Sequence, residues 1–193
     1  MKRVCVFAGS SVGVRPEYQD AARALGRALA ERGIGLVYGG ARVGLMGIAA
    51  DAVLSAGGDA IGVIPAALVA REIAHDGLTE LRIVSSMHER KALMADLSDA
   101  FVAVPGGWGT LEEFFEVLTW AQLGLHRKPC GLLNVLGYFD GLLSFLDHSV
   151  TEGFLRREYG SMIAVSASPS ALIDRLGSHQ APAVEKWIDR EST

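Results

Sequence analysis

The chain has 193 residues, 50% of them hydrophobic, and this length fits one domain with a sizeable buried core. Its formal net charge is −4 and it has no basic run, which argues against a nucleic-acid polymer as partner, because phosphate backbones are bound chiefly through Lys and Arg. No apolar stretch reaches membrane-spanning length, and the two cysteines lack the spacing of a disulfide framework or a zinc site. The expected location is therefore a reducing cytoplasm.

Strand-like and helix-like segments alternate along the chain. The predicted strands are the short apolar runs 4–8, 34–38, 60–64, 81–84, 100–104, 131–135 and 162–165. The predicted helices are 16–32, 45–56, 87–97, 110–123, 139–151 and 171–176. Short apolar strands without alternation indicate burial on both faces, and helices between them imply right-handed crossovers. The sequence thus predicts an α/β fold, a Rossmann-like doubly wound parallel sheet of about seven strands flanked by helices, as one domain over residues 1–177 with a tail over 178–193.

Glycine-rich segments follow the first, second and fifth predicted strands, at residues 9–11, 39–44 and 105–109. In a doubly wound sheet, the ligand crevice lies beyond the carboxyl ends of the strands. These three segments are therefore expected to meet at one edge of the sheet and to border a ligand site.

The strongest local signal is PGGWGTLEE at residues 105–113, which follows a strand and opens a helix. Glycines let the backbone approach a ligand closely, free N–H groups at a helix start attract an anion, and Thr110 adds a hydroxyl donor. A phosphate monoester is the natural guest, and the alternative is a tight strand-to-helix turn without a ligand. A dinucleotide site is disfavoured because Glu112 occupies the third glycine position of GxGxxG, and no P-loop motif is present.

Two charged residues near this edge have open alternatives. Glu113 either acts in catalysis or closes a capping box with Thr110, since the spacing Thr-x-x-Glu fits both. A second capping box, Ser86-x-x-Glu89, places Arg90 near the start of the helix that follows the fourth strand. Arg90 there either meets a bound anion or the Glu113 carboxylate, or it is an ordinary solvated arginine.

The remaining polar and aromatic candidates carry weaker signals. The five histidines have no metal-ligand spacing and are expected at the surface or at helix ends. Trp108 interrupts the glycine loop and either lies over a base or packs beside a subunit. Glu112 and Glu116 stand four residues apart on one helix face, which like-charge repulsion disfavours unless both have a role there.

Together these motifs resemble the Lonely Guy (LOG) family of cytokinin-activating nucleoside 5′-monophosphate phosphoribohydrolases. The family's PGGxGTxxE is present without change at residues 105–113, and its Met-x-x-Arg-Lys matches Met87, Arg90 and Lys91. Its two earlier glycine loops and its post-motif helix match residues 7–11, 38–47 and 119–124. The chain departs from the family at Val69-Ala70, where Met-Pro is frequent, and at Ala41-Arg42, where Gly-Ser is common.

The resemblance implies hydrolysis of the N-glycosidic bond of N6-modified adenosine 5′-monophosphates, and of AMP, to free base and ribose 5-phosphate. It implies that Arg90 and Glu113 are catalytic, that no metal or organic cofactor takes part, and that the chain forms a homodimer. The substrate-binding residues that it implies are Glu72, Lys91, Gly106, Gly107, Trp108, Gly109, Thr110, Leu111, Glu112 and Thr119. Candidates from the first two loops are Ser10, Gly39, Gly40, Gly44 and Met46.

The sequence leaves two alternative functions open and argues against a third. One is a broad-range purine nucleotide nucleosidase for salvage, and another is a non-catalytic nucleotide or cofactor carrier on the same fold. The family's older label, lysine decarboxylase, is not supported, because pyridoxal phosphate chemistry needs a Schiff-base lysine and none of the few lysines stands in an evident cofactor setting.

Overall fold

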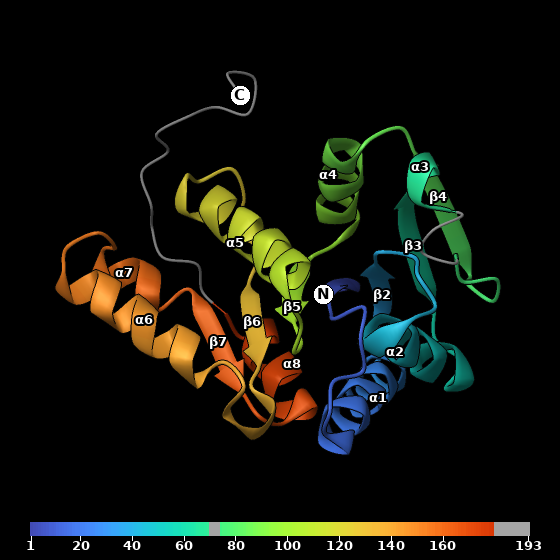
Figure 1. The fold of residues 1–193 in the computed structure, drawn as a ribbon, viewed down its shortest axis with the longest axis horizontal. Helices are drawn as coiled ribbons and strands as arrows, with labels where there is room; N and C mark the ends of the chain where they lie inside the picture. Colours follow the sequence, from blue (N-terminus) through green and yellow to red (C-terminus); the bar gives the residue numbers. More distant parts are fainter. Residues whose placement is uncertain (70–73, 180–193) are drawn as a thin grey trace.

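The computed structural model describes residues 1–69 and 74–179, and its centre is one sheet of seven parallel strands (Figure 1). The strands are β1 Arg3–Phe7, β2 Gly35–Tyr38, β3 Ala60–Pro65, β4 Glu80–Val84, β5 Ala100–Ala103, β6 Cys130–Leu133 and β7 Ile163–Ser166. They lie in the order β4-β3-β2-β1-β5-β6-β7, so the chain winds from the centre to one edge and then from the centre to the other. The predicted doubly wound parallel sheet is confirmed.

Helices cover both faces of the sheet. They are α1 Pro16–Glu31, α2 Gly44–Ser55, α3 Ala66–Val69, α4 Met87–Leu97, α5 Trp108–Gln122, α6 Asp140–Thr151, α7 Arg157–Gly160 and α8 Pro169–Gly177. One face carries α1, α2 and α8, and the other carries α4, α5 and α6. Figure 1 places α1 and α2 on the opposite side of the sheet from α4 and α5. Among the described residues, no helix combines the length and the apolar character needed to cross a membrane.

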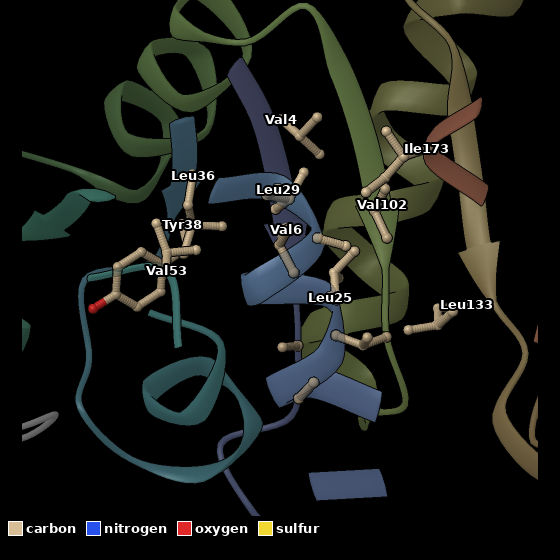
Figure 2. Close-up of a cluster of buried hydrophobic side chains, with 14 of the residues drawn as sticks. Val4, Val6, Leu25, Leu29, Leu36, Tyr38, Val53, Val102, Leu133 and Ile173 are labelled. Atoms are coloured by element: carbon tan, nitrogen blue, oxygen red, sulfur yellow. The ribbon is translucent and has the colours of Figure 1, made fainter. Parts of the chain in front are cut away.

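Strand β1 shows why short apolar runs suffice for this fold. Val4 and Val6 point into the cluster beneath α1, whereas Cys5 and Phe7 point into the cluster beneath α4 and α5. Because successive side chains face opposite sides of a strand, a strand buried on both faces must be apolar at every position. Figure 2 shows Val4 and Val6 packed with Leu25 of α1 in the first cluster.

The edge strands depart from this expectation. The side chains of β4 include the exposed Arg82 and Ile83, and every residue of β7 is only partly buried. Each edge strand has a neighbour on one side only, so fewer helices cover it. The prediction of burial on both faces therefore holds for the central strands and is wrong for these two.

The start of α4 agrees with the predicted cap. Ser86 Oγ accepts a hydrogen bond of 3.1 Å from the Glu89 N–H, which confirms the predicted cap of α4. The Glu89 carboxylate reaches the N–H of Ser85, at 2.7 Å, one residue further back than a regular capping box requires.

Three short elements were not predicted from the sequence, because three or four residues are too few to show a period. They are α3, α7 and the 3-10 turn Val135–Gly137.

The structure excludes the capping-box alternative for Thr110 and Glu113. Helix α5 begins at Trp108, two residues earlier than expected, and Gly107 is its N-cap. The Gly107 carbonyl accepts the first hydrogen bond, from Leu111 N–H at 3.2 Å, so Thr110 already lies inside the helix. Glu113 is therefore not needed as a capping residue.

His126 also corrects an expectation, since it is partly buried between α5 and β6 rather than at the surface. Its Nε2 donates to the Val117 carbonyl at 2.9 Å, its Nδ1 accepts from Lys128 N–H at 3.1 Å, and its ring contacts Phe101. This arrangement suits only the neutral imidazole. Burial lowers the pKa of His126 to about 4. The charge of nearby Lys128 also lowers this pKa, whereas the hydrogen bond to the Val117 carbonyl raises it in part.

We expect this histidine to make the protein less stable in mild acid. An unfolded chain binds a proton at His126 near pH 6.5, whereas the folded chain resists doing so until about pH 4, so stability falls as the pH drops through this window. The full shift corresponds to about 3 kcal/mol, which partial solvent contact reduces to about 2 kcal/mol. Urea unfolding at pH 7 and pH 4.5 measures the loss of unfolding free energy. This loss should be about 2 kcal/mol smaller in the His126→Gln variant. An identical pH dependence in both proteins would contradict the assignment.

Candidate active site

Three loops meet at the carboxyl edge of the sheet, after β1, β2 and β5. The Gly9 N–H donates to the Pro105 carbonyl at 3.1 Å, and the Leu45 N–H donates to the Gly9 carbonyl at 2.9 Å. Gly44 has a φ of 63°, and a Cβ there would collide with the Ser10 backbone, so only glycine allows the second loop to approach the first this closely. The predicted meeting of the glycine segments at one edge is confirmed.

A cavity of about 300 Å³ opens above these loops. This volume is at the small end of the range for small-molecule sites. Its lining combines residues from the loop after β1, from α2, from α4 and from the start of α5: Ala8, Ser10, Met46, Met87, Arg90, Gly107, Trp108, Gly109, Thr110, Glu112 and Glu113.

The start of α5 forms one side of the cavity. A Cβ added at Gly107 or Gly109 would meet nothing within 4 Å, so the backbone of both residues is open to a ligand. Gly106 differs, because the space of its missing side chain is filled by Thr110 Oγ1 and by the Gly9 N–H. The first N–H groups of a helix have no intrahelical acceptor and carry the positive end of its dipole. This loop is thus suited to a phosphate monoester.

Arg90 of α4 and Glu113 of α5 approach each other in the lining of the cavity. Arg90 Nη2 lies 3.8 Å from Glu113 Oε1, and the two side chains are only 7% and 14% exposed. Gly39 makes room for the guanidinium, since a Cβ there would collide with Arg90 Nη2. Within the described residues, the buried Nε of Arg90 has no hydrogen-bond partner. A buried unsatisfied donor is costly, and its persistence at a cavity wall is consistent with a ligand that completes it.

Lys91 is bound differently from Arg90, although the two are adjacent. Its Nζ lies 2.7 Å from Glu112 Oε1 and 2.9 Å from Glu116 Oε1, which explains how α5 accommodates two acidic residues on one face. Burial by itself lowers the pKa of Lys91, but the hydrogen bonds to the two carboxylates outweigh it and raise the pKa above its ordinary value. Lys91 therefore stays protonated and joins α4 to α5.

The predicted residues fall into distinct groups. Those that line the cavity are Arg90, Glu113, Gly107, Trp108, Gly109, Thr110, Glu112, Ser10 and Met46. Gly106, Lys91, Gly39 and Gly44 lie behind this lining, as described above. Gly40, with a φ of 78°, is not among the lining residues, and a Cβ there would meet β3 and Leu81.

Three predicted positions remain, of which two lie away from the lining of the cavity and one cannot be placed. Leu111 packs against the core cluster beneath α5, and the exposed Thr119 donates its hydroxyl to the Phe115 carbonyl at 2.7 Å, beyond the residues that line the cavity. Glu72 lies outside the described residues.

Two lining residues were not among the predicted ligand contacts. Met87 precedes Arg90 by three residues, so helical periodicity could have placed both on one face of α4. Ala8 follows the last residue of β1, and its position at the cavity depends on the strand order, which no local pattern reveals. Among residues 1–69 and 74–179, no three His, Cys, Asp or Glu side chains come together in a way that could hold a metal ion.

Comparison with known sequences gives consistent results. The family model described as "Possible lysine decarboxylase" matches residues 46–176. The cytokinin riboside 5′-monophosphate phosphoribohydrolase LOG1 of Arabidopsis thaliana is 50% identical over 99% of this chain and 89% of its own length. The phosphoribohydrolase LOG of Oryza sativa subsp. japonica is 52% identical over 91% of this chain and 72% of its own length.

Solved structures extend the likeness of the fold. The molybdenum cofactor carrier protein of Chlamydomonas reinhardtii superposes with a TM-score of 0.69 at 23% identity, covering 92% of this chain and 99% of that chain. The molybdenum cofactor binding protein of Rippkaea orientalis gives a TM-score of 0.69 at 24% identity, covering 92% and 97% of the two chains. At this level of identity, the comparison establishes the architecture and nothing about ligands.

Proposed function

Because the chain belongs to the LOG family of cytokinin riboside 5′-monophosphate phosphoribohydrolases, we propose that it hydrolyses the N-glycosidic bond of N6-modified adenosine 5′-monophosphates, and of AMP. The products are the free base and ribose 5-phosphate. The observation that carries the proposal is the pairing of a buried Arg90–Glu113 couple with an open helix start in one cavity. A sugar phosphate needs both a site for its anion and a carboxylate near its anomeric carbon.

The phosphate is proposed to bind at the start of α5. The N–H groups of Gly107, Trp108 and Gly109 belong to the first turn of the helix or to its N-cap, where no intrahelical acceptor is available. The absence of side chains at Gly107 and Gly109 leaves room for the phosphate oxygens. Anchoring the phosphate here fixes the ribose relative to Glu113, so the binding energy also contributes to the rate.

Glu113 is proposed as the carboxylate that acts at the anomeric carbon. Cleavage of the glycosidic bond builds positive charge on the ribose ring, which a nearby carboxylate stabilises. A water oxygen bonds to C1′ while the bond from C1′ to the base nitrogen breaks, and the bonding electron pair leaves with the base. Glu113 takes a proton from that water, the departing base takes up a proton from solvent, and Glu113 releases its proton to solvent, so the net reaction consumes one water.

Arg90 is proposed to orient Glu113 and to contact the sugar phosphate. Its Nη2 lies on the Glu113 side and its Nε has no partner among the described residues, so donors of one guanidinium can serve both groups. The positive charge of Arg90 also attracts the Glu113 carboxylate at 3.8 Å and so fixes its position.

A pyridoxal-dependent decarboxylase is a weaker candidate. Schiff-base chemistry needs a lysine that can lose its proton. Lys91 contacts Glu112 in the lining of the cavity, and its two carboxylate partners keep it protonated. The site geometry therefore supports hydrolysis of a glycosidic bond better than the lysine decarboxylation that the description of the family model names.

Two further properties are proposed, a homodimer and a cytoplasmic location. A homodimer is proposed from the family relationship, and Trp108, which is 91% exposed, offers an apolar side chain for such a contact at the mouth of the cavity. Cytoplasmic location is proposed because Cys5 and Cys130 are both free and buried in the core, which suits a reducing compartment.

A chromatographic substrate panel tests the proposed function. Purified protein is incubated with N6-isopentenyl-AMP, AMP, GMP, CMP and N6-isopentenyladenosine, and the released base is quantified. We expect base release from the first two and little from CMP or from the riboside, which lacks the phosphate. Equal rates with all purine nucleotides would favour the salvage nucleosidase, and tight binding of AMP with no release of base would favour a carrier and contradict the proposal.

A further inference from the structure

Tyr138 lies on the loop that follows β6 and is not among the residues that line the cavity. Tyr138 comes directly after the 3-10 turn Val135–Gly137, and its hydroxyl donates a hydrogen bond of 2.7 Å to the Gly106 carbonyl, 32 residues away in the sequence. Gly106 belongs to the loop after β5, the strand next to β6. A side chain from one loop thus holds the backbone of the neighbouring loop at the position where the phosphate is proposed to bind.

We propose that Tyr138 is a positioning residue that aims the Gly107 N–H at the substrate phosphate. The inference rests on the proposed function, because it assigns a role within the same site. A peptide group is planar, and in its trans form the carbonyl and the following N–H point in opposite directions. The described chain has no cis peptide bond, so holding the Gly106 carbonyl toward Tyr138 turns the Gly107 N–H the other way.

The Gly107 N–H, which points the opposite way from the Gly106 carbonyl, is the donor proposed to bind the phosphate. Gly107 lines the cavity, its missing side chain leaves open space, and its N–H donates no hydrogen bond to another protein group within residues 1–69 and 74–179. Without a hydrogen bond at the Gly106 carbonyl, this glycine-flanked peptide could rotate, because glycine restricts φ and ψ least of all residues. Tyr138 removes that freedom before a ligand arrives.

The Tyr138 ring is itself fixed by its surroundings. It makes edge-on contacts with Tyr18, at a ring-centre distance of 5.7 Å, and with Phe139, at 5.0 Å. The turn before it contains Leu136 at a φ of 53°, a left-handed conformation that a leucine adopts only when its surroundings impose it. Strain of this kind often occurs at functional sites, and here it lies in the turn directly before Tyr138.

Removing only the hydroxyl tests this role. Tyr138→Phe keeps both ring contacts, so its melting temperature should stay within a few degrees of the parent. The matched control is Tyr18→Phe, which removes a hydroxyl from the neighbouring ring and leaves the Gly106 carbonyl untouched. Calorimetric titration with ribose 5-phosphate should give a Kd about three- to tenfold higher in Tyr138→Phe, the effect of one neutral hydrogen bond. The Kd of the control and the affinity of all three proteins for adenine should stay unchanged.

Kinetics separate positioning from a merely structural role. For AMP, Tyr138→Phe should raise KM by a similar factor while kcat stays within about twofold, because only the Gly107 donor is affected and the other N–H groups at the start of α5 still hold the ribose against Glu113. A lower kcat at unchanged KM, or an unchanged Kd for ribose 5-phosphate, would overturn the inference. In the unsubstituted protein, the Gly107 amide resonance should also shift when ribose 5-phosphate is added, and the absence of a shift would overturn it independently of any variant.

These readouts distinguish the inference from the proposed function. A parent protein that releases no base but binds ribose 5-phosphate in a Tyr138-dependent manner would contradict the function and support the positioning role. A parent that releases base with the same ribose 5-phosphate affinity as Tyr138→Phe would contradict the positioning role alone.

Discussion

Replacing Glu113 with glutamine is expected to lower kcat for base release from N6-isopentenyl-AMP by about 10²- to 10⁴-fold, the usual contribution of a general acid or base. Glutamine has nearly the same shape as glutamate, but it can neither accept the proton of the attacking water nor offset positive charge on the ribose. The side chain is 14% exposed at the cavity wall, so water cannot easily replace it. A discontinuous chromatographic assay with the base as readout measures the effect.

A carboxylate one turn further along α5 provides the control for this substitution. Glu116 pairs with Lys91 at 2.9 Å and does not line the cavity, so Glu116→Gln removes the same charge from the same helix. It should retain most of the activity, and Glu113→Gln should still bind AMP and melt within a few degrees of the parent. Turnover of Glu113→Gln within about tenfold of the parent would show that Glu113 does not have the assigned role.

Arg90→Ala is the second change with a large expected effect. We expect kcat/KM to fall by about 10²- to 10³-fold, as is typical when a preorganised donor at a developing charge is removed. The loss has two physical origins, because Glu113 loses its cationic neighbour at 3.8 Å and the sugar phosphate loses a buried donor group. Arg90→Lys should recover only part of the activity, because an ammonium cannot reproduce the planar fork of a guanidinium. Steady-state kinetics with AMP measure all three proteins.

A steric substitution separates the position of the guanidinium from its presence. Gly39→Ala introduces a Cβ that collides with Arg90 Nη2, so Arg90 remains but must move. Its activity should lie between those of the parent and Arg90→Ala. Gly141→Ala serves as the control, because a Cβ there meets nothing within 4 Å and Gly141 belongs to α6, away from the cavity. Parent-like kcat/KM in Arg90→Ala would contradict the role of Arg90.

The architecture could be predicted from the sequence because the central strands carry their signal locally. Burial on both faces requires uninterrupted apolar runs, and the glycine segments after β1, β2 and β5 mark the edge where ligands bind. The edge strands β4 and β7 were less predictable because their exposure depends on strand order. The start of α5 was misplaced because Gly107 caps it without any side-chain signal.

The site was predictable in its residues and only partly in its geometry. The motif at residues 105–113 gave the phosphate-binding candidates, but Thr-x-x-Glu fitted both a capping box and a catalytic carboxylate. Only the observed helix start at Trp108 removes the capping alternative. The approach of Arg90 to Glu113 and the contact of Tyr138 with Gly106 join different elements, and no spacing in the sequence encodes such tertiary contacts.

The central claim is that one cavity holds the phosphate at the start of α5 and the glycosidic bond against Glu113. The most direct test is a crystal structure of Glu113→Gln with bound N6-isopentenyl-AMP, in which the substrate should persist uncleaved. We predict that the phosphate oxygens accept hydrogen bonds from the backbone N–H groups of residues 107–110 and that C1′ faces the side chain of residue 113. A nucleotide bound elsewhere, or a residue 113 side chain directed away from the ribose, would contradict the account.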